Sequence, residues 1–258
     1  MQNRKEIAHQ TVRIVEARGY PGVDLTGPVD AAIAGTRLHL PDEALPLDAP
    51  VVNASPRIEV TFESTLAAAR RAGSGSASLV FASARNPGGG FLRGAEAQEE
   101  SIARSSALHA CQLTQPSFYE AHRRSGDLRY SHRVIYSPAV PVFRNDQGGL
   151  LDAPYTTAML TAAAPNRGAI SDPEIAATVP ETLRARALRV LEVASFHGHR
   201  TLVLGAWGCG VFRNDPAVVA DGFAHALKTL PHFDFVVFAV LDRLPGTPVH
   251  RAFAATFG

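Results

Sequence analysis

Lysine is scarce in this sequence: 25 of its 258 residues are basic, but only Lys5 and Lys228 are lysines. The formal net charge is only +1, so we expect neither DNA nor an anionic membrane as a partner. Cysteine is equally rare. Cys111 and Cys209 are too few for a disulfide framework, and no Cys/His cluster has zinc-like spacing. We therefore expect a reducing compartment and no bound metal.

Long apolar runs are also missing. The first twenty residues lack the continuous apolar core of a signal peptide, and no stretch is long enough to span a bilayer. We therefore expect a cytoplasmic protein. An apolar content of 46% with 19% charged residues is ordinary for a globular protein, which argues against a disordered chain.

Strands alternate with helices over most of the chain. Residues 4–18 have the spacing of an amphipathic helix, and the Pro- and Gly-containing stretch 21–56 predicts an irregular segment. Strands are predicted at 57–62, 77–83, 133–138, 157–163, 201–207 and 233–241, with a loop or hairpin over 141–154. Helices are predicted at 64–73, 99–111, 173–199, 216–230 and the C-terminus. The alternation predicts an α/β sandwich with a sheet covered on both faces, plus an N-terminal extension, 1–57, packed on a domain of residues 58–258.

Two clusters of glycines each lie between a buried strand and a helix, within 79–103 and within 202–229. Such loops let backbone N–H groups approach a ligand and place the positive end of a helix behind it, so the natural ligand is a phosphate. One cluster alone could simply turn the chain, but two clusters at the ends of central strands favour a binding crevice. Neither cluster fits the Walker or the dinucleotide pattern, which disfavours ATP hydrolysis and hydride transfer.

Two adjacent acids, Glu99 and Glu100, follow Gln98 at the start of a predicted helix. Helical neighbours diverge by about 100°, so the two carboxyl groups must have different tasks. They could be solvated acids that the helix dipole favours. Beside a bound diphosphate, however, negative charge and partial burial would raise a carboxyl's pKa toward that of a general acid.

The run "FASARNPGGGFLRGAEAQEE" resembles the signature of poly(ADP-ribose) glycohydrolases, a triple glycine followed at short spacing by Gln-Glu-Glu. The stretches "VTFESTLAAARR", "YSPAVPVFRNDQGGLLDAPY" and "GAWGCGVFRND" resemble the microbial form of that family, so the resemblance covers most of residues 58–242. It implies a macrodomain-like three-layer α/β/α sandwich with a mixed central sheet. ADP-ribose would lie across the carboxyl ends of the strands, with no cofactor and no metal.

The resemblance also implies roles for single residues. Glu100 would be the catalytic acid and then base, Glu99 would anchor ribose hydroxyls, and Gln98 would order the loop or contact the ribose. Phe212 would pack on the distal ribose, and residues 238–240 would form a wall of the adenine pocket. Cys209 is better interpreted as a small packed residue than as a nucleophile. The remaining substrate contacts would come from Asn86, Gly88, Gly89, Gly90, Gly208, Cys209, Gly210 and Val211.

The implied activity is hydrolysis of the ribose-ribose O-glycosidic bonds of poly(ADP-ribose) on ADP-ribosylated proteins, with release of ADP-ribose. Such an enzyme reverses ADP-ribosylation in the DNA damage response. The resemblance also implies cleavage mainly from chain ends, with the N-terminal 60 residues covering the site where the chain would continue. The alternatives are a macrodomain that only binds ADP-ribose and a hydrolase that removes single ADP-ribose units from proteins or bases. A phosphatase or sugar-nucleotide enzyme is a more distant one.

Overall fold

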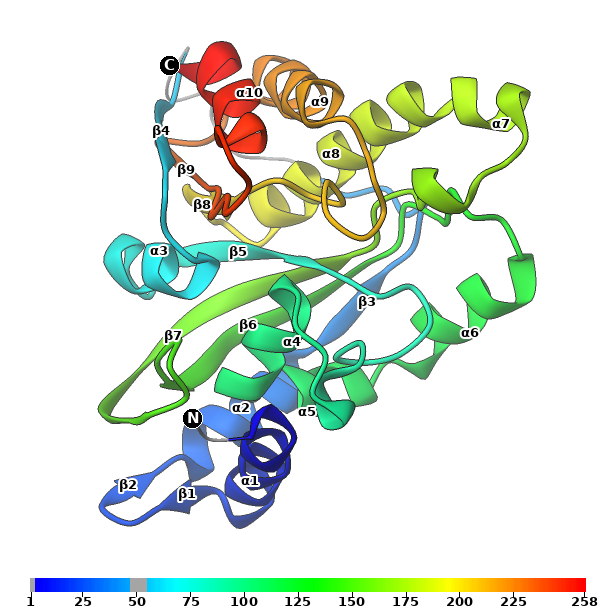
Figure 1. The fold of residues 1–258 in the computed structure, drawn as a ribbon. Coiled ribbons are helices and arrows are strands. Elements are labelled where there is room, and N and C mark those ends of the chain that lie inside the picture. Colours follow the sequence, from blue (N-terminus) through cyan, green and yellow to red (C-terminus); the bar gives the residue numbers. More distant parts are fainter. Residues whose placement is uncertain (1–2, 47–54) are drawn as a thin grey trace.

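A mixed seven-stranded sheet forms the centre of the computed structural model, which describes residues 3–46 and 55–258 (Figure 1). Its strands are β3 (Arg37–His39), β4 (Arg57–Thr61), β5 (Ser76–Phe81), β6 (Val134–Arg144), β7 (Leu150–Ala162), β8 (Thr201–Leu204) and β9 (Phe235–Ala239). They lie in the order β3-β6-β7-β5-β8-β9-β4. Pairing is parallel from β7 to β4, whereas β6 is antiparallel to both of its neighbours. The short strands β1 (Gly19–Tyr20) and β2 (Val23–Asp24) form a separate antiparallel pair.

Helices cover both faces of the sheet (Figure 1). They are α1 (Arg4–Ala17), α2 (Thr26–Gly35), α3 (Thr65–Ala72), α4 (Gln98–Ser105), α5 (Leu108–Leu113), α6 (Pro116–Ser125), α7 (Pro173–Ala177), α8 (Val179–Phe196), α9 (Pro216–Thr229) and α10 (Pro248–Phe257). The larger core lies between the sheet and α8, α9 and α10, where Leu160 and Phe238 are fully buried. A second core, which contains Val80 and Met159, lies on the face covered by α2, α4 and α5. The predicted sandwich with a mixed sheet is confirmed.

Local predictions were less accurate where tertiary contacts decide the structure. The segment 21–56 is not irregular throughout, because α2 forms there and buries Val29 and Ala32. The single helix expected over 99–111 is two helices, and Ser106 between them forms a bridge to Val142. Strands β6 and β7 run on into a long hairpin, and α6 was not predicted. Part of 21–56, residues 47–54, lies outside the described residues. The division at residue 57 stays a prediction.

Among the described helices, none combines the length and apolarity that crossing a bilayer requires.

One buried hydroxyl of α1 links this helix to both α4 and β6. Thr11, only 2% exposed, donates from Oγ1 to the carbonyl oxygen of Arg104 in α4 at 2.6 Å. Oγ1 of Thr11 in turn accepts a hydrogen bond from Nε of Arg144, at the end of β6, at 3.0 Å. Because Arg144 is itself 3% exposed, its Nε has little access to water as an alternative partner.

We predict that Thr11→Val destabilises the protein by about 1–3 kcal/mol, because the shape is kept while buried Arg144 loses an acceptor. The free energy of unfolding, measured by urea denaturation, checks this. The control is Thr229→Val, since Thr229 is exposed and its hydroxyl donates to the carbonyl oxygen of His225 in its own helix. Equal losses in the two variants would contradict the prediction.

Candidate active site

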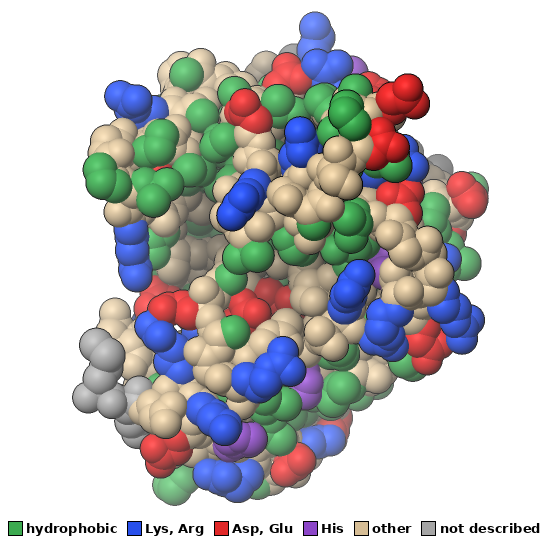
Figure 2. Space-filling view, turned by 45° about the vertical axis from the view of Figure 1, so that its right-hand side comes forward, with side chains coloured by type: hydrophobic (Ala, Val, Ile, Leu, Met, Phe, Trp, Pro, Cys, Tyr) green, Lys and Arg blue, Asp and Glu red, His purple; other side chains and the backbone are tan. Residues whose placement is uncertain are grey.

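The two glycine loops leave the sheet side by side. Strands β5 and β8 are parallel neighbours, with Ala77 opposite Leu202, so the loops that follow them begin at the same edge of the sheet. A cleft of about 1540 Å³ opens there, lined by Gln98, by residues 206–212 and by residues 239–244, among others. Figure 2 shows the molecule hollowed between an upper and a lower half, with hydrophobic side chains gathered above the hollow and acidic ones at its bottom. The crevice that the two loops predict is present.

The first loop closes directly on Glu100. Gly88 and Gly89 have φ angles of 64° and 58°, in the left-handed region that favours glycine. A Cβ at Gly89 would lie only 2.3 Å from Oε1 of Glu100. The backbone N–H of Gly90 donates to that same carboxylate oxygen at 2.9 Å. A side chain at position 89 would therefore push the loop away from Glu100.

Glu99 occupies a different environment from Glu100. It is 2% exposed, and its carboxylate accepts hydrogen bonds from the Ser83 N–H at 2.6 Å and from Nε2 of Gln112 at 2.9 Å. Burial raises the pKa of Glu99 to about 8, although the hydrogen bonds from Ser83 and Gln112 oppose the rise. Glu100, in contrast, is only partly buried. The two acids are thus separated by environment, as their divergence on a helix predicts.

Both polar atoms of the Gln98 side chain form hydrogen bonds within the protein. Its Oε1 accepts from the backbone N–H of Phe81 at 2.8 Å, and its Nε2 donates to the carbonyl oxygen of Leu79 at 2.7 Å and to Oγ1 of Thr65 at 3.1 Å. Gln98 therefore extends the hydrogen bonding of β5 and fixes the start of α4. Because both amide protons are used, its contacts favour ordering of the loop over contact with a ribose.

The second loop also needs a glycine. Gly208 has a φ of 72°, and a Cβ there would lie 2.5 Å from Nδ2 of Asn214 and 2.6 Å from Cβ of Ala164. Buried Asn214 holds the loop, because its Nδ2 donates to the carbonyl oxygen of Pro165 at 2.9 Å and to that of Gly208 at 3.2 Å. The tip is open: Val211 is 80% exposed, and a Cβ at Gly210 would meet no atom within 4 Å.

The Cys209 thiol is not prepared for nucleophilic attack. Burial raises its pKa to about 12, so the reactive thiolate is rare at neutral pH. Its Sγ lies 3.9 Å from the carbonyl oxygen of Trp207, as a weak donor. These contacts agree with a small packed residue.

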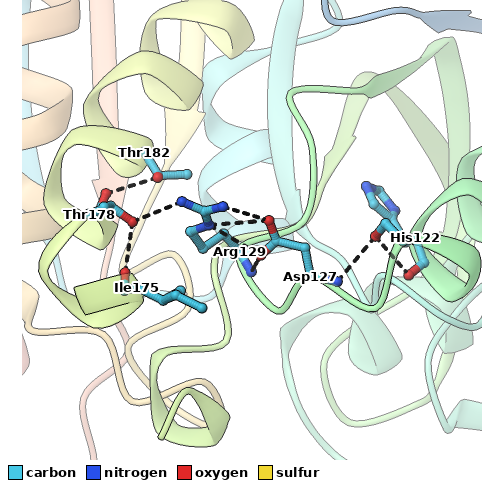
Figure 3. Close-up of polar contacts among 7 residues, drawn as sticks. His122, Asp127, Arg129, Ile175, Thr178 and Thr182 are labelled. Atoms are coloured by element: carbon cyan, nitrogen blue, oxygen red, sulfur yellow. Dashed lines mark hydrogen bonds and ion pairs between the residues drawn. The ribbon is translucent and has the colours of Figure 1, made fainter. Parts of the chain in front are cut away.

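Phe212 lines the cleft, and its ring lies next to that of Tyr130. Its ring centroid is 6.0 Å from that of Tyr130. The loop that carries Tyr130 is held by an ion pair of 2.8 Å between Asp127 and Arg129, and Arg129 donates to Oγ1 of Thr178 at 3.1 Å (Figure 3). The loop between α6 and β6 is therefore fixed to the junction of α7 and α8. Through Tyr130, the same loop contacts the ring of Phe212.

Two parts of the expected site differ from expectation. Asn86 is exposed and, like residues 88–90, Glu99 and Glu100, is not among the residues that line the cleft. It contributes its backbone instead, accepting from the Gly89 N–H at 3.0 Å. Of the expected adenine wall, Ala239 and Val240 line the cleft, but Phe238 is fully buried in the core. An aromatic ring that we did not predict, Phe62, also lines the cleft and is 54% exposed.

Sequence reasoning also missed the residues that support the site. Gln112 is fully buried, and it joins Glu99 to the first loop by accepting from the Gly88 N–H at 2.7 Å. Ser83 and Asn214 act through the contacts given above. Phe62 stacks on His250 with ring centroids 3.5 Å apart, and its place just after β4 was the only available signal. Within residues 3–46 and 55–258, no three His, Cys, Asp or Glu side chains are grouped to hold a metal.

Comparison with known proteins places this geometry in a family. The family description "Microbial-type PARG, catalytic domain" matches residues 8–145. The chain is 50% identical to the poly(ADP-ribose) glycohydrolase of Thermomonospora curvata, with a TM-score of 0.92 and coverage of 98% of this chain and 99% of that one. The structure of that enzyme bound to the inhibitor ADP-HPD gives 51% identity and a TM-score of 0.91, with the same coverage.

The Deinococcus radiodurans enzyme, in complex with ADP-ribose, is 46% identical, with a TM-score of 0.83 and coverage of 91% of this chain and 98% of that one. No curated protein matches the chain. The match to the family and the full-length similarity to solved glycohydrolases agree with the paired acids beside two glycine loops. The chain therefore belongs to the microbial-type poly(ADP-ribose) glycohydrolases, which are glycoside hydrolases.

Proposed function

We propose that the chain hydrolyses the ribose-ribose O-glycosidic bonds of protein-attached poly(ADP-ribose) with Glu100 as the general acid and base, releasing ADP-ribose. The observation that carries this assignment is the contrast between the two acids. Glu99 is enclosed by donors of the protein, whereas Glu100 is only partly buried and meets the glycine loop through one oxygen. Relatives bound to ADP-ribose and to ADP-HPD support the ligand class.

The first step is cleavage of the glycosidic bond. Protonated Glu100 gives its proton to the ribose oxygen that leaves, while positive charge develops at the anomeric carbon of the distal ribose. The resulting carboxylate then takes a proton from the attacking water, which replaces the leaving group at that carbon. One carboxyl group thus acts as acid and then as base. The N–H of Gly90 fixes its orientation through Oε1.

Glu99 anchors the distal ribose in this proposal. Because its pKa lies near 8, the carboxyl is largely protonated at neutral pH, so it can donate a hydrogen bond to a sugar hydroxyl as well as accept one. The three glycines border the same sugar, and Asn86 holds Gly89 through its backbone oxygen. Phe212 packs on its other face and directs the anomeric carbon toward Glu100. The N–H groups of residues 208–211 and the start of α4 bind the diphosphate.

We propose cleavage mainly from chain ends, which the segments around the cleft support. Asn3, Arg4 and Lys5 at the start of α1 line it, together with Asn145–Gly148 of the β6–β7 hairpin. Ile7 packs against Gly148, because a Cβ at Gly148 would lie 2.8 Å from Cδ1 of Ile7. We propose that these segments leave one exit from the cleft, on the side of the leaving group, so that only the end of a polymer can occupy the site.

We predict that Glu100→Gln lowers kcat by a factor of about 10² or more, because the amide cannot donate the proton that the leaving oxygen needs. The measurement is release of ADP-ribose from poly(ADP-ribose) in the presence of EDTA. Binding of ADP-ribose, measured in parallel by calorimetry, should change by less than about threefold. If the wild type binds ADP-ribose and releases none, the chain is a binding module or acts on another linkage.

The burial of Glu99 predicts a pH dependence of stability. Its folded pKa of about 8 lies above the ordinary value of 4.5, so between these values the unfolded chain ionises while the folded one stays protonated. Stability from this group therefore falls as pH rises from 4.5 to 8, by at most roughly 1.4 kcal/mol per pH unit, and levels off above. Urea denaturation across this range gives the free energy of unfolding of wild type and of Glu99→Gln. As the pH rises, the value for Glu99→Gln should increase relative to that of the wild type. Glu120→Gln, at a position whose side chain is 46% exposed, is the control. Parallel curves for wild type and Glu99→Gln would refute the assignment.

End-trimming predicts the products of a long polymer. Single ADP-ribose units should accumulate from the earliest times, while the remaining chains shorten gradually. Chromatography of a time course, begun with polymer of narrow length distribution, separates the two modes. Early appearance of oligomers of intermediate length would show internal cleavage.

A further inference from the structure

Two cations next to the catalytic loop have no task in the reaction described so far. Arg93 ends the 3-10 turn Phe91–Arg93, and Lys5 lies in the first turn of α1. Both side chains are exposed and line the cleft. Within the described parts of the chain, neither side chain forms a hydrogen bond or an ion pair. Their basic neighbours differ, because Arg4 pairs with Glu96 and Arg104 donates to the carbonyl oxygen of Ala95.

The Arg93 guanidinium lies close to the catalytic carboxyl. A Cβ at Gly90 would be 3.8 Å from Nη2 of Arg93 and 3.8 Å from Oε1 of Glu100. The two atoms are therefore separated by no more than twice that distance. Lys5 lies next to the residue that follows Arg93, since a Cβ at Gly94 would be 3.7 Å from the Cβ of Lys5. Two unpaired positive charges thus border the place where the leaving oxygen must be.

The polymer supplies an anion at this place. The diphosphate of the bound unit is assigned to residues 208–211, so it does not need Arg93. The leaving oxygen belongs to an adenosine of the preceding unit, and the diphosphate of that unit hangs from the same sugar. A phosphate therefore follows the leaving oxygen at the distance of one sugar. The planar guanidinium fork of arginine suits a phosphate and stays charged at any working pH.

We propose that Arg93, with Lys5 beside it, binds the diphosphate of the polymer unit on the leaving side of the scissile bond. This inference rests on the proposed function and adds a subsite to it. The subsite selects poly(ADP-ribose) over single ADP-ribose units on proteins, because an amino-acid leaving group carries no phosphate there.

The test compares Arg93→Gln and Lys5→Gln with the control Arg13→Gln. Arg13 is an exposed arginine of α1 that does not line the cleft. With poly(ADP-ribose), Arg93→Gln should raise KM about 3- to 10-fold while kcat changes less than about twofold, because one exposed charge-assisted contact is lost. The slope of log KM against log salt should fall by about 0.7 to 1, as for one fewer neutralised phosphate. Lys5→Gln should act in the same direction and more weakly, and Arg13→Gln should match the wild type.

A second substrate, ADP-ribose joined to an aryl alcohol without phosphate, locates the contact. There the ratio of KM between Arg93→Gln and wild type should be much smaller than with the polymer. If that ratio is equal on both substrates, or if Arg93→Gln matches Arg13→Gln on the polymer, the subsite is refuted while the glycohydrolase function stands. If the wild type cleaves no polymer at all, the proposed function fails and the subsite fails with it.

Discussion

The parallel pairing of β5 with β8 is the constraint on which the site depends. Parallel neighbours end at the same edge of a sheet, so this pairing brings two loops together that are more than a hundred residues apart in sequence. Each loop then needs glycine where it approaches a neighbour closely, Gly89 against Glu100 and Gly208 against Asn214. The cleft, the Glu100 carboxyl and the start of α4 all take their positions from this edge.

Burial distinguishes the environments of Glu99 and Glu100. A carboxyl that loses water without gaining a cation holds its proton more strongly, and this is the situation of Glu99 between Ser83 and Gln112. Glu100 follows it by one residue and points elsewhere on the helix, toward the glycine loop. In our account one acid positions the sugar and the other moves the proton. Arg93 and Lys5, to which we assign polymer binding, line the cleft near the first loop and take no part in the proton transfers we propose.

The sequence predicted what local pattern and a specific motif determine. Apolar runs located β5, β8 and β9, the two glycine clusters located both loops, and the Gln-Glu-Glu signature located both acids. It did not predict Gln112, because a buried amide in a helix has no local pattern, and its importance comes only from reaching Glu99 and Gly88 across the fold. The split between α4 and α5 was missed for the same reason, since Ser106 pairs with Val142 of a distant strand. Phe62 was missed because one exposed aromatic ring after a strand is common.

The most direct test of the central claim is a crystal structure of Glu100→Gln with a bound ADP-ribose dimer. The account predicts the distal ribose between Phe212 and the glycine loop, its hydroxyls on Glu99, and the glycosidic oxygen within hydrogen-bond distance of the residue at position 100. A distal ribose bound elsewhere in the cleft, or a glycosidic oxygen facing Glu99 instead, would contradict the assignment of the two acids.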